Sequence, residues 1–331
     1  MLSSFKNIFD NTYIQTAGLL ALIFSPFADA IGGSLYWILS GFLFILFLFG
    51  LYDELKTQKK FNNEIIHIPI VIKVDGGTNI KYVLNMLLKE IGKITLRNNY
   101  ELDLKKYHSI DIYDYIYEYI GDIYDFDRLM SFIRIIKYDL YKLEKKLDGR
   151  VKFHLAYYKK PSIGFIIGTL FRTEGLFIYQ NNDAKNTFEQ IADIKDRRYK
   201  ENRMESIRYT IKESIIDTNI NEILIIINSA SHLVNYNALS LNNFVNTVTI
   251  TLNSNGTIPY EDDWVEYASE IYSIINKLQT RYSKFTIAHA MPEALSVILG
   301  MALENYWDIS ITQYEAGEYK FIYNMKQIIY Y

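Results

Sequence analysis

The chain has 331 residues, a net charge of -3 and no cysteine. The lack of cysteine excludes disulfides, cysteine-ligated iron-sulfur clusters and thiol nucleophiles, and it suits a reducing compartment. The weak negative charge excludes a general attraction to DNA or RNA polymers, because such binding depends on neutralising phosphates over a basic face. A small anion in one basic pocket is compatible with this charge.

Two apolar stretches stand at the N-terminus, and no charged residue occurs from Asn11 to Ala28 or from Ala30 to Tyr52. A helix crosses the hydrocarbon layer of about 30 Å with about 20 residues, so both stretches are predicted to span a bilayer, over residues 11–28 and 33–52. A cleavable signal peptide is the alternative for the first stretch. Against it, the preceding basic charge is weak and a longer apolar span follows directly.

The lysines outside the two spans set the expected orientation. Lys6 precedes the first span, three lysines follow the second, and the short connection between the spans carries no basic residue. Because basic loops stay on the cytoplasmic side, both termini are expected in the cytoplasm. The sequence therefore predicts a transmembrane hairpin over residues 1–55, a short polar linker over residues 56–63 and a cytoplasmic domain over residues 64–331.

The first half of the cytoplasmic part alternates strand and helix patterns. The apolar run that ends at Val74 predicts a buried strand, and Thr78 is the expected cap of the helix that follows. Residues 110–124 predict an amphipathic helix with an acidic outer face, and residues 129–147 predict another amphipathic helix. The acidic spacing is typical of a solvated face, so no metal site is predicted.

The second half repeats this alternation. Residues 222–228 predict a buried strand, and an amphipathic helix is expected to begin near Asp262. Central strands that are apolar on both faces, alternating with helices, predict a mostly parallel sheet covered by helices.

Residues 151–180 and 283–314 resemble each other. Each segment runs from Lys-Phe in a strand, through a proline and an apolar helix that carries a glycine, to a second strand. This order of elements predicts an internal repeat of two fused α/β halves, over about residues 64–185 and 215–331.

The prolines and glycines of the repeat indicate where a ligand binds. Pro161 and Pro292 mark the first turn of a helix, where a proline leaves no hydrogen bond unmade. Gly168 and Gly300 lie within these helices and predict a close approach to the sheet or to a neighbouring helix. Ligands of open parallel sheets bind outside the carboxyl ends of the strands, where helix N-termini point. Both proline loops are expected to open there.

The segments GFIIGTLFR and LFIYQ, and the stretch FTIAHAMPEALSVILGMALENYWDISITQYE, resemble the SAVED domain of bacterial antiphage signalling systems. The similarity is strongest from His289 to Gly300. It covers most of the chain after about residue 64 and is specific in Lys152 to Gln180 and in Lys284 to Glu315. It implies two fused CARF-like, Rossmann-like halves. With the hairpin, the chain resembles a transmembrane SAVED effector of cyclic-oligonucleotide-based antiphage (CBASS) defence.

The resemblance implies a function as well as a fold. The domain is expected to bind a cyclic di- or oligonucleotide made by a partner CD-NTase nucleotidyltransferase, without a cofactor or a metal. Binding is expected to assemble homo-oligomers, whose clustered hairpins permeabilise the bacterial inner membrane and cause growth arrest or cell death. No Walker loop, His-Glu-x-x-His pair or GxSxG elbow occurs, so no catalytic residue is predicted. A membrane-tethered phosphodiesterase or ring nuclease is the alternative, and a passive membrane scaffold is a third hypothesis.

Candidate contacts to the nucleotide lie at the strand ends. An ammonium beside a helix N-terminus complements a phosphate, although a solvated loop explains such lysines too. A histidine at a strand end stacks on a base or serves as a capped structural residue, and serines there donate to a phosphate or only shape a turn. The candidate ligand-binding residues are Lys159, Lys160, Pro161, Ser162, Arg172, Ser229, Ser231, His232, His289, Met291, Pro292 and Glu293.

A basic cluster follows the first repeat. Its pattern predicts a helix with a solvated or subunit-facing surface, and ligand contact is the alternative. The cluster consists of Lys195, Arg197, Arg198, Lys200, Arg203 and Arg208.

Overall fold

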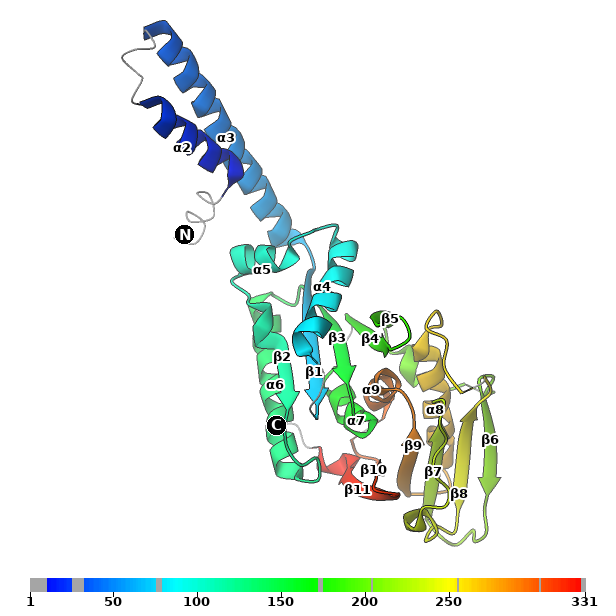
Figure 1. Cartoon of the computed structure of the whole chain (residues 1–331). Helices are drawn as coiled ribbons and strands as arrows, with labels where there is room; N and C mark the ends of the chain where they lie inside the picture. The colour runs from blue at the N-terminus through cyan, green and yellow to red at the C-terminus, as the bar shows by residue number, and fades with distance from the viewer. Residues whose placement is uncertain are drawn as a thin grey trace. The chain divides into compact units, whose positions relative to one another are not determined.

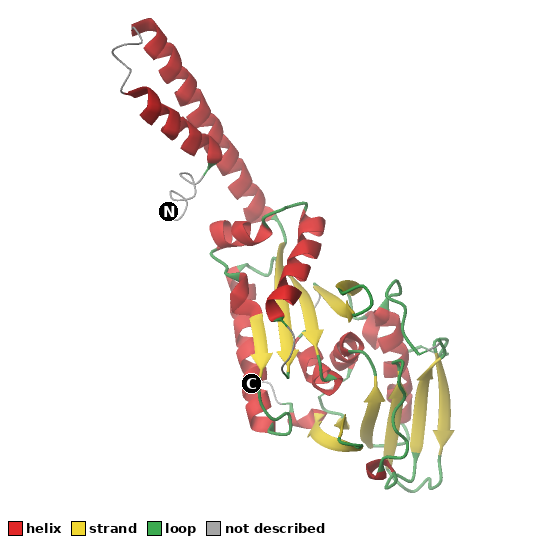
Figure 2. Cartoon of the chain, in the orientation of Figure 1, coloured by secondary structure: helices red, strands yellow, loops and turns green. Residues whose placement is uncertain are grey.

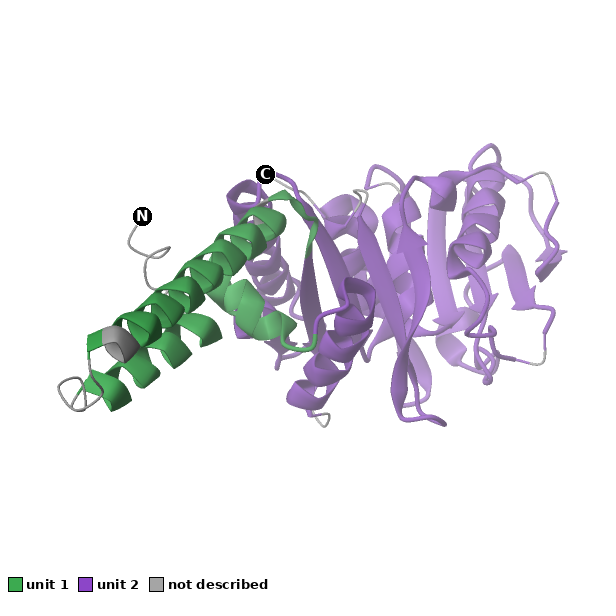
Figure 3. Cartoon of the chain, turned by 90° about the horizontal axis from the view of Figure 1, so that it is seen from above, with its two compact units in different colours: residues 1–66, 98–111 green, residues 67–97, 112–331 purple. Residues whose placement is uncertain are grey.

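The structure is a computed structural model that describes residues 11–25, 33–75, 79–171, 175–203, 205–254, 256–303 and 305–328. The chain forms two compact units, which Figure 3 distinguishes by colour. Unit 1 comprises residues 1–66 and 98–111, and unit 2 comprises residues 67–97 and 112–331.

Unit 1 is helical and consists of α2 (Thr12–Phe24), α3 (Gly33–Asn63) and α5 (Tyr100–His108) (Figure 1). The second apolar stretch is helical as predicted, but α3 continues through residues 56–63, where the sequence suggested a linker. In the first apolar stretch the helix ends at Phe24, and residues 26–32 lie outside the described residues.

Among the described residues, only α3 has the length and apolarity to cross a bilayer, over Trp37–Phe61. α2 is apolar but has 13 residues. The two helices pack together beside Gly50, because a Cβ at Gly50 would lie 2.8 Å from Ile14 Cγ1. The rings of Tyr13 and Phe49 meet edge to face with 5.2 Å between their centroids.

Unit 2 contains two sheets with helices packed on them, which confirms the predicted α/β class (Figure 2). The first sheet has the order β2 (Ile116–Tyr119), β1 (Ile66–Val74), β3 (Val151–Tyr158), β4 (Leu176–Asn182), β5 (Thr187–Ile194). The second has the order β11 (Glu318–Asn324), β10 (Asp308–Glu315), β9 (Lys284–Ala290), β7 (Glu222–Asn228), β8 (Thr247–Leu252), β6 (Tyr209–Ser214). β1 with β2, β3 with β4, and β7 with β8 and β9 pair in parallel.

The strands are connected by amphipathic or fully buried helices. These are α4 (Ile80–Thr95), α6 (Phe126–Lys146), α7 (Pro161–Leu170), α8 (Trp264–Leu278) and α9 (Glu293–Ala302). The apolar stripes predicted for α4, α6 and α8 are largely buried, because they face the sheets. Asn79 caps α4 by accepting a hydrogen bond from Lys81 N at 3.1 Å, and Thr78, the expected cap, lies outside the described residues.

The helix predicted over residues 110–124 is wrong. This segment forms a short 3-10 turn (Ile112–Tyr115) followed by the edge strand β2. Tyr117 and Tyr119 point into the core, and the intervening Glu118 pairs with Lys73 Nζ of β1 at 2.6 Å. Aromatic and β-branched residues that alternate with a paired charge favour a strand, and tertiary pairing with β1 decides the conformation.

The internal repeat is visible in the topology of the sheets. The order β2-β1-β3-β4-β5 of the first sheet recurs as β8-β7-β9-β10-β11 in the second, to which β6 adds one more edge strand. The chain therefore builds the same arrangement twice. The exact half boundaries stay a prediction from the sequence.

The two halves meet where α7 packs on α9. A Cβ on Gly168 would overlap Val297 O and lie 2.7 Å from Met301 N, and a Cβ on Gly300 would lie 2.6 Å from Phe165 Cα. A side chain at either glycine would therefore push one helix backbone away from the other. The close approach predicted from the two repeated glycines is between these helices.

Candidate functional site

The carboxyl ends of β1 and β3 present a basic turn before α7. Asp75, Lys159 and Lys160 have φ angles of 75°, 68° and 52°. Left-handed backbone is uncommon for residues other than glycine and clusters at functional sites. Lys160 Nζ lies 3.7 Å from Asp75 Oδ2, and Tyr157 Oη donates to Lys160 O at 2.7 Å. The two lysines are therefore held on a fixed backbone beside the helix N-terminus.

The first turn of α7 is bound to the other half of unit 2. Pro161 is the first helical residue, as predicted, and Ser162 follows it fully buried. Ser162 Oγ donates to Gln313 Oε1 of β10 at 2.6 Å, and Tyr323 Oη of β11 donates to Ser162 O at 2.7 Å. The Ser162 hydroxyl thus joins the two halves.

The first turn of α9 is bound in the reciprocal way. Gln180, at the end of β4, accepts a hydrogen bond from Ala294 N at 3.0 Å and donates to Glu293 Oε2 at 3.0 Å. Gln180 therefore caps α9, whose N-cap residue Pro292 has no side-chain donor or acceptor. Sequence analysis missed Gln180 and Gln313, although both lie in the last strand of the repeated segments.

The two helix N-termini consequently differ in charge. At α7 the two lysines Lys159 and Lys160 outnumber the single carboxylate of Asp75, whereas at α9 the first residue is Glu293, whose carboxylate lies at the helix start. A phosphate is attracted to a helix N-terminus with free N–H groups and nearby cations, and it is repelled by a carboxylate. The α7 end is therefore the anion-attracting end of this site.

His289 lies in β9 and packs against α7. Its side chain is 9% exposed, and its ring lies 5.5 Å from the ring centroid of Phe165. Burial lowers the pKa of His289 to about 4, and repulsion from His232 acts in the same direction. His289 is thus a neutral imidazole at neutral pH.

The remaining candidates fall in different environments. Ser229 is fully buried, its N–H donates to Ala290 O at 2.7 Å, and its Oγ donates to Tyr209 Oη at 3.2 Å. Ser231 and His232 are exposed in the loop after β7. Met291 is buried. Arg172 lies outside the described residues.

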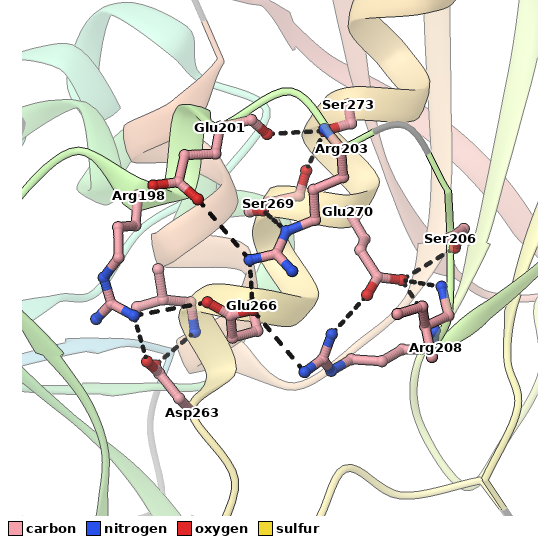
Figure 4. A network of polar contacts seen from close by, with 12 residues as sticks. Arg198, Glu201, Arg203, Ser206, Arg208, Asp263, Glu266, Ser269, Glu270 and Ser273 are labelled. Carbon is pink, nitrogen blue, oxygen red and sulfur yellow. Dashed lines mark hydrogen bonds and ion pairs between the residues drawn. The ribbon is translucent and has the colours of Figure 1, made fainter.

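The basic cluster does not form the predicted helix. The only helical part among its described residues is a 3-10 turn, Arg198–Lys200, and the segment continues as a loop along α8. Figure 4 shows three of its arginines aimed at the acidic side chains of α8. Arg198 Nη1 lies 3.1 Å from Asp263 Oδ2, Arg203 Nη2 pairs with Glu266, and Arg208 Nη1 lies 2.6 Å from Glu270 Oε1. The three guanidinium groups therefore form ion pairs with carboxylates of the same chain.

A second buried histidine lies in the first sheet. His154 is 0% exposed, and its ring nitrogens lie 2.7 Å from His67 Nδ1 and 2.8 Å from Tyr179 Oη. Burial lowers the pKa of His154 to about 2, and the charges of His67 and Lys152 act in the same direction.

Acidification is expected to destabilise the protein through His154 and His289. Between about pH 6.5 and pH 4 these side chains take up protons in the unfolded chain but stay neutral in the folded chain, so stability falls as pH falls. The loss at pH 5 is about 2 kcal/mol for each histidine. Chemical denaturation at pH 7.5 and 5.0 measures it. His154→Gln should shrink the difference, because it removes one of the two buried imidazoles. An undiminished difference in His154→Gln would contradict this assignment.

Within the described ranges, no group of three or more histidine, aspartate or glutamate side chains is placed to hold a metal ion.

The chain was compared with models of known protein families and with curated proteins. The family model described as "SMODS-associated and fused to various effectors sensor domain" (SAVED) matches residues 134–326, more than half of the chain. No curated protein sequence matches the chain.

Solved structures of two receptors are similar to the chain. The Acinetobacter baumannii Cap4 SAVED/CARF-domain containing receptor with the cyclic trinucleotide 2'3'3'-cAAA is similar at a TM-score of 0.51 and 13% identity, over 85% of this chain and 56% of that chain. The Moraxella osloensis Cap4 SAVED/CARF-domain containing receptor has a TM-score of 0.47 and 14% identity, over 85% of this chain and 54% of that chain. The chain thus spans about half the length of these receptors.

Proposed function

Because the chain belongs to the SAVED family of sensor domains, we propose that unit 2 binds a cyclic di- or oligonucleotide and that unit 1 anchors the protein in the bacterial inner membrane. The family match is the observation that carries this proposal. The A. baumannii receptor that shares the fold holds a cyclic trinucleotide, which makes rings of this class the first ligands to test.

The geometry of the strand ends supports the proposal. Lys159 and Lys160 supply cations beside the N-terminus of α7, and their left-handed backbone keeps them at the carboxyl ends of the parallel strands. Phosphates of a nucleotide ring complement this arrangement. Ser231, His232 and Pro292 border the corresponding ends in the other half, where the ligand's sugars and bases are expected. Ser229 and Met291 support the site from within the core.

The proposed output is membrane damage. A CD-NTase nucleotidyltransferase supplies the ring after infection, ligand binding stabilises a homo-oligomer, and oligomers concentrate the membrane helices until the bilayer becomes permeable. α3 supplies the membrane-crossing helix. In this proposal the apolar stretch that contains α2 forms a second span, and the lysines that flank the hairpin keep unit 2 in the cytoplasm. This mechanism needs no cofactor and no catalytic residue of its own.

A thermal-shift panel of cyclic di-, tri- and tetranucleotides on the full chain in lipid nanodiscs tests the binding. One ring is expected to raise the melting temperature and to give larger assemblies in size-exclusion chromatography. If the ring is instead cleaved during the incubation, the protein is a ring nuclease. If no ring of the panel stabilises the protein, the sensor proposal fails.

Replacing both Lys159 and Lys160 by alanine is expected to weaken binding of that ring at least ten-fold, because each lysine contributes a charge-assisted contact to a phosphate. Titration of the melting temperature with the ring measures the loss. Lys185→Ala is the matched control, since Lys185 is an exposed lysine on another turn of the same half, 3.4 Å from Glu189. If the double variant and the control bind the ring with equal affinity, Lys159 and Lys160 do not contact the ligand.

A further inference from the structure

The membrane helix does not end where its apolar stretch ends. α3 has 31 residues, which gives a length of about 46 Å at about 1.5 Å per residue. The hydrocarbon layer is about 30 Å thick and the uncharged part of α3 ends at Tyr52, so roughly the last ten residues of α3, which carry its charges, extend beyond this layer as a helix. α3 is therefore one continuous helix from the apolar stretch to the residues just before β1.

The extension of α3 is fastened to α5 by a buried cluster. Glu54 is 4% exposed, and its Oε2 lies 2.9 Å from Lys106 Nζ and 3.5 Å from Asn11 Nδ2. Two turns further along α3, Phe61 is 1% exposed and stacks on the ring of Tyr107 with 4.7 Å between centroids.

The charge of Glu54 also affects the pKa of Tyr107. Burial raises the pKa of Tyr107, and the Glu54 carboxylate raises it further by its charge and by a hydrogen bond. One carboxylate is thus shared by the start of α2 and by two consecutive residues of α5. Removing a partner from a desolvated ion pair leaves a charge uncompensated, so this cluster resists separation of α3 from α5.

The position of α5 in the chain shows why its contact with α3 matters for the sensor. α5 follows α4 and precedes β2, both of which belong to the first half of unit 2, yet α5 itself belongs to the compact unit of the membrane helices. The chain passes between the units after Ile66, after Arg97 and before Ile112. α5 is therefore tied at both of its ends to the sensor and packs with its side chains on α3.

We propose that α5 is the coupling element of this protein, which holds the extension of α3 through Lys106 and Tyr107 and passes movements of α4 and β2 to the membrane helix. That the nucleotide causes this movement rests on the proposed function. The attachment of α5 to α3, which we call the clamp and which consists of the Glu54–Lys106 ion pair and the Phe61–Tyr107 stack, does not rest on it, because both contacts lie within unit 1.

Two variants at one ion pair test the clamp without a ligand. The chain has no cysteine, so Leu55→Cys on α3 and Leu102→Cys on α5, both at exposed positions, provide unique sites for a pair of spin labels. In nanodiscs the distance distribution between the labels is expected to be narrow. Lys106→Ala should broaden it, and the swap of Glu54→Lys with Lys106→Glu should narrow it again. Lys105→Ala is the control, because Lys105 is exposed and pairs with Asp111 at 3.4 Å.

The same variants in vesicles test the coupling. Lys106→Ala is expected to reduce nucleotide-triggered dye release at least ten-fold while the nucleotide concentration for half-maximal thermal stabilisation changes less than two-fold. Full dye release by Lys106→Ala, or an unchanged label distance, would overturn the proposal. If no nucleotide acts on the unmodified chain, the proposed function fails, and the label distances alone then decide whether α5 clamps α3.

Discussion

Replacing Gly300 by alanine is expected to lower the free energy of unfolding by about 3 kcal/mol or more. The added Cβ would overlap Phe165 O and lie 2.6 Å from Phe165 Cα, and both atoms belong to the backbone of α7. A flexible side chain can rotate away from a new methyl group, but a helix backbone can make room only by shifting the whole helix. Overpacking of a dense core costs about 1–3 kcal/mol even where side chains absorb part of it.

Chemical denaturation of the full chain measures this loss. Gly168→Ala should have a similar effect, because its Cβ meets Val297 O and Met301 N of α9. The double variant should lose less than the sum of the two, since one separation of the helices relieves both overlaps. Gly41→Ala on α3 is the control, as no atom lies within 4 Å of its added Cβ. Wild-type stability of Gly300→Ala would show that α7 and α9 do not pack at these glycines.

Replacing Glu270 by alanine is expected to cost about 3–5 kcal/mol of stability. Its carboxylate is 1% exposed and accepts hydrogen bonds from Arg208 Nη1 at 2.6 Å, Arg208 N at 2.9 Å, Ser206 Oγ at 3.0 Å and Ile207 N at 3.2 Å. Alanine would leave two backbone donors and a partly buried guanidinium without their acceptor. The loop before β6 would then lose its attachment to α8.

Glu213→Ala provides the comparison, because Glu213 forms a two-point ion pair with Arg281 at 3.0 and 2.9 Å on the surface. An exposed pair of this kind contributes less than about 1 kcal/mol. Denaturation curves of the two variants should therefore differ by several kcal/mol. Equal losses would mean that the loop is held by other contacts.

The fold was largely predictable from the sequence because its signals are local and repeated. Short stretches of sequence are enough to specify these elements: β1 and β7 are continuous apolar runs, and α6 has an apolar stripe at helical spacing. The repeat of strand, proline, glycine helix and strand predicted two similar halves. The two sheets confirm it in their shared strand order.

The errors have a common physical origin in contacts between distant segments. Residues 110–124 carry tyrosines and isoleucines at spacings that fit a helix as well as a strand, and only pairing with β1 selects the strand at residues 116–119. The arginines after residue 195 adopt a loop because their partners lie on α8, more than 60 residues away in sequence. Periodicity within a segment contains no information about such partners.

The candidate site was predictable in outline and not in detail. The strand ends and the prolines predicted where the candidate residues lie in the fold, and Lys159 and Lys160 lie at the expected helix N-terminus. Gln180 and Gln313 were missed because each acts on the helix of the other half, which no local pattern reveals. For the same reason the sequence did not show that Ser162 is already bound within the protein.

The shared strand order also has an evolutionary consequence. A duplicated half that packs through α7 and α9 descends most simply from a symmetric homodimer, whose ligand would have needed a matching two-fold axis. In the fused chain the two helix starts have diverged, with Lys160 and Pro161 in one half where Pro292 and Glu293 stand in the other. Because the two halves of one chain can differ, the proposed ligand no longer needs a two-fold axis. A ring with an odd number of nucleotides therefore fits this architecture as readily as an even one.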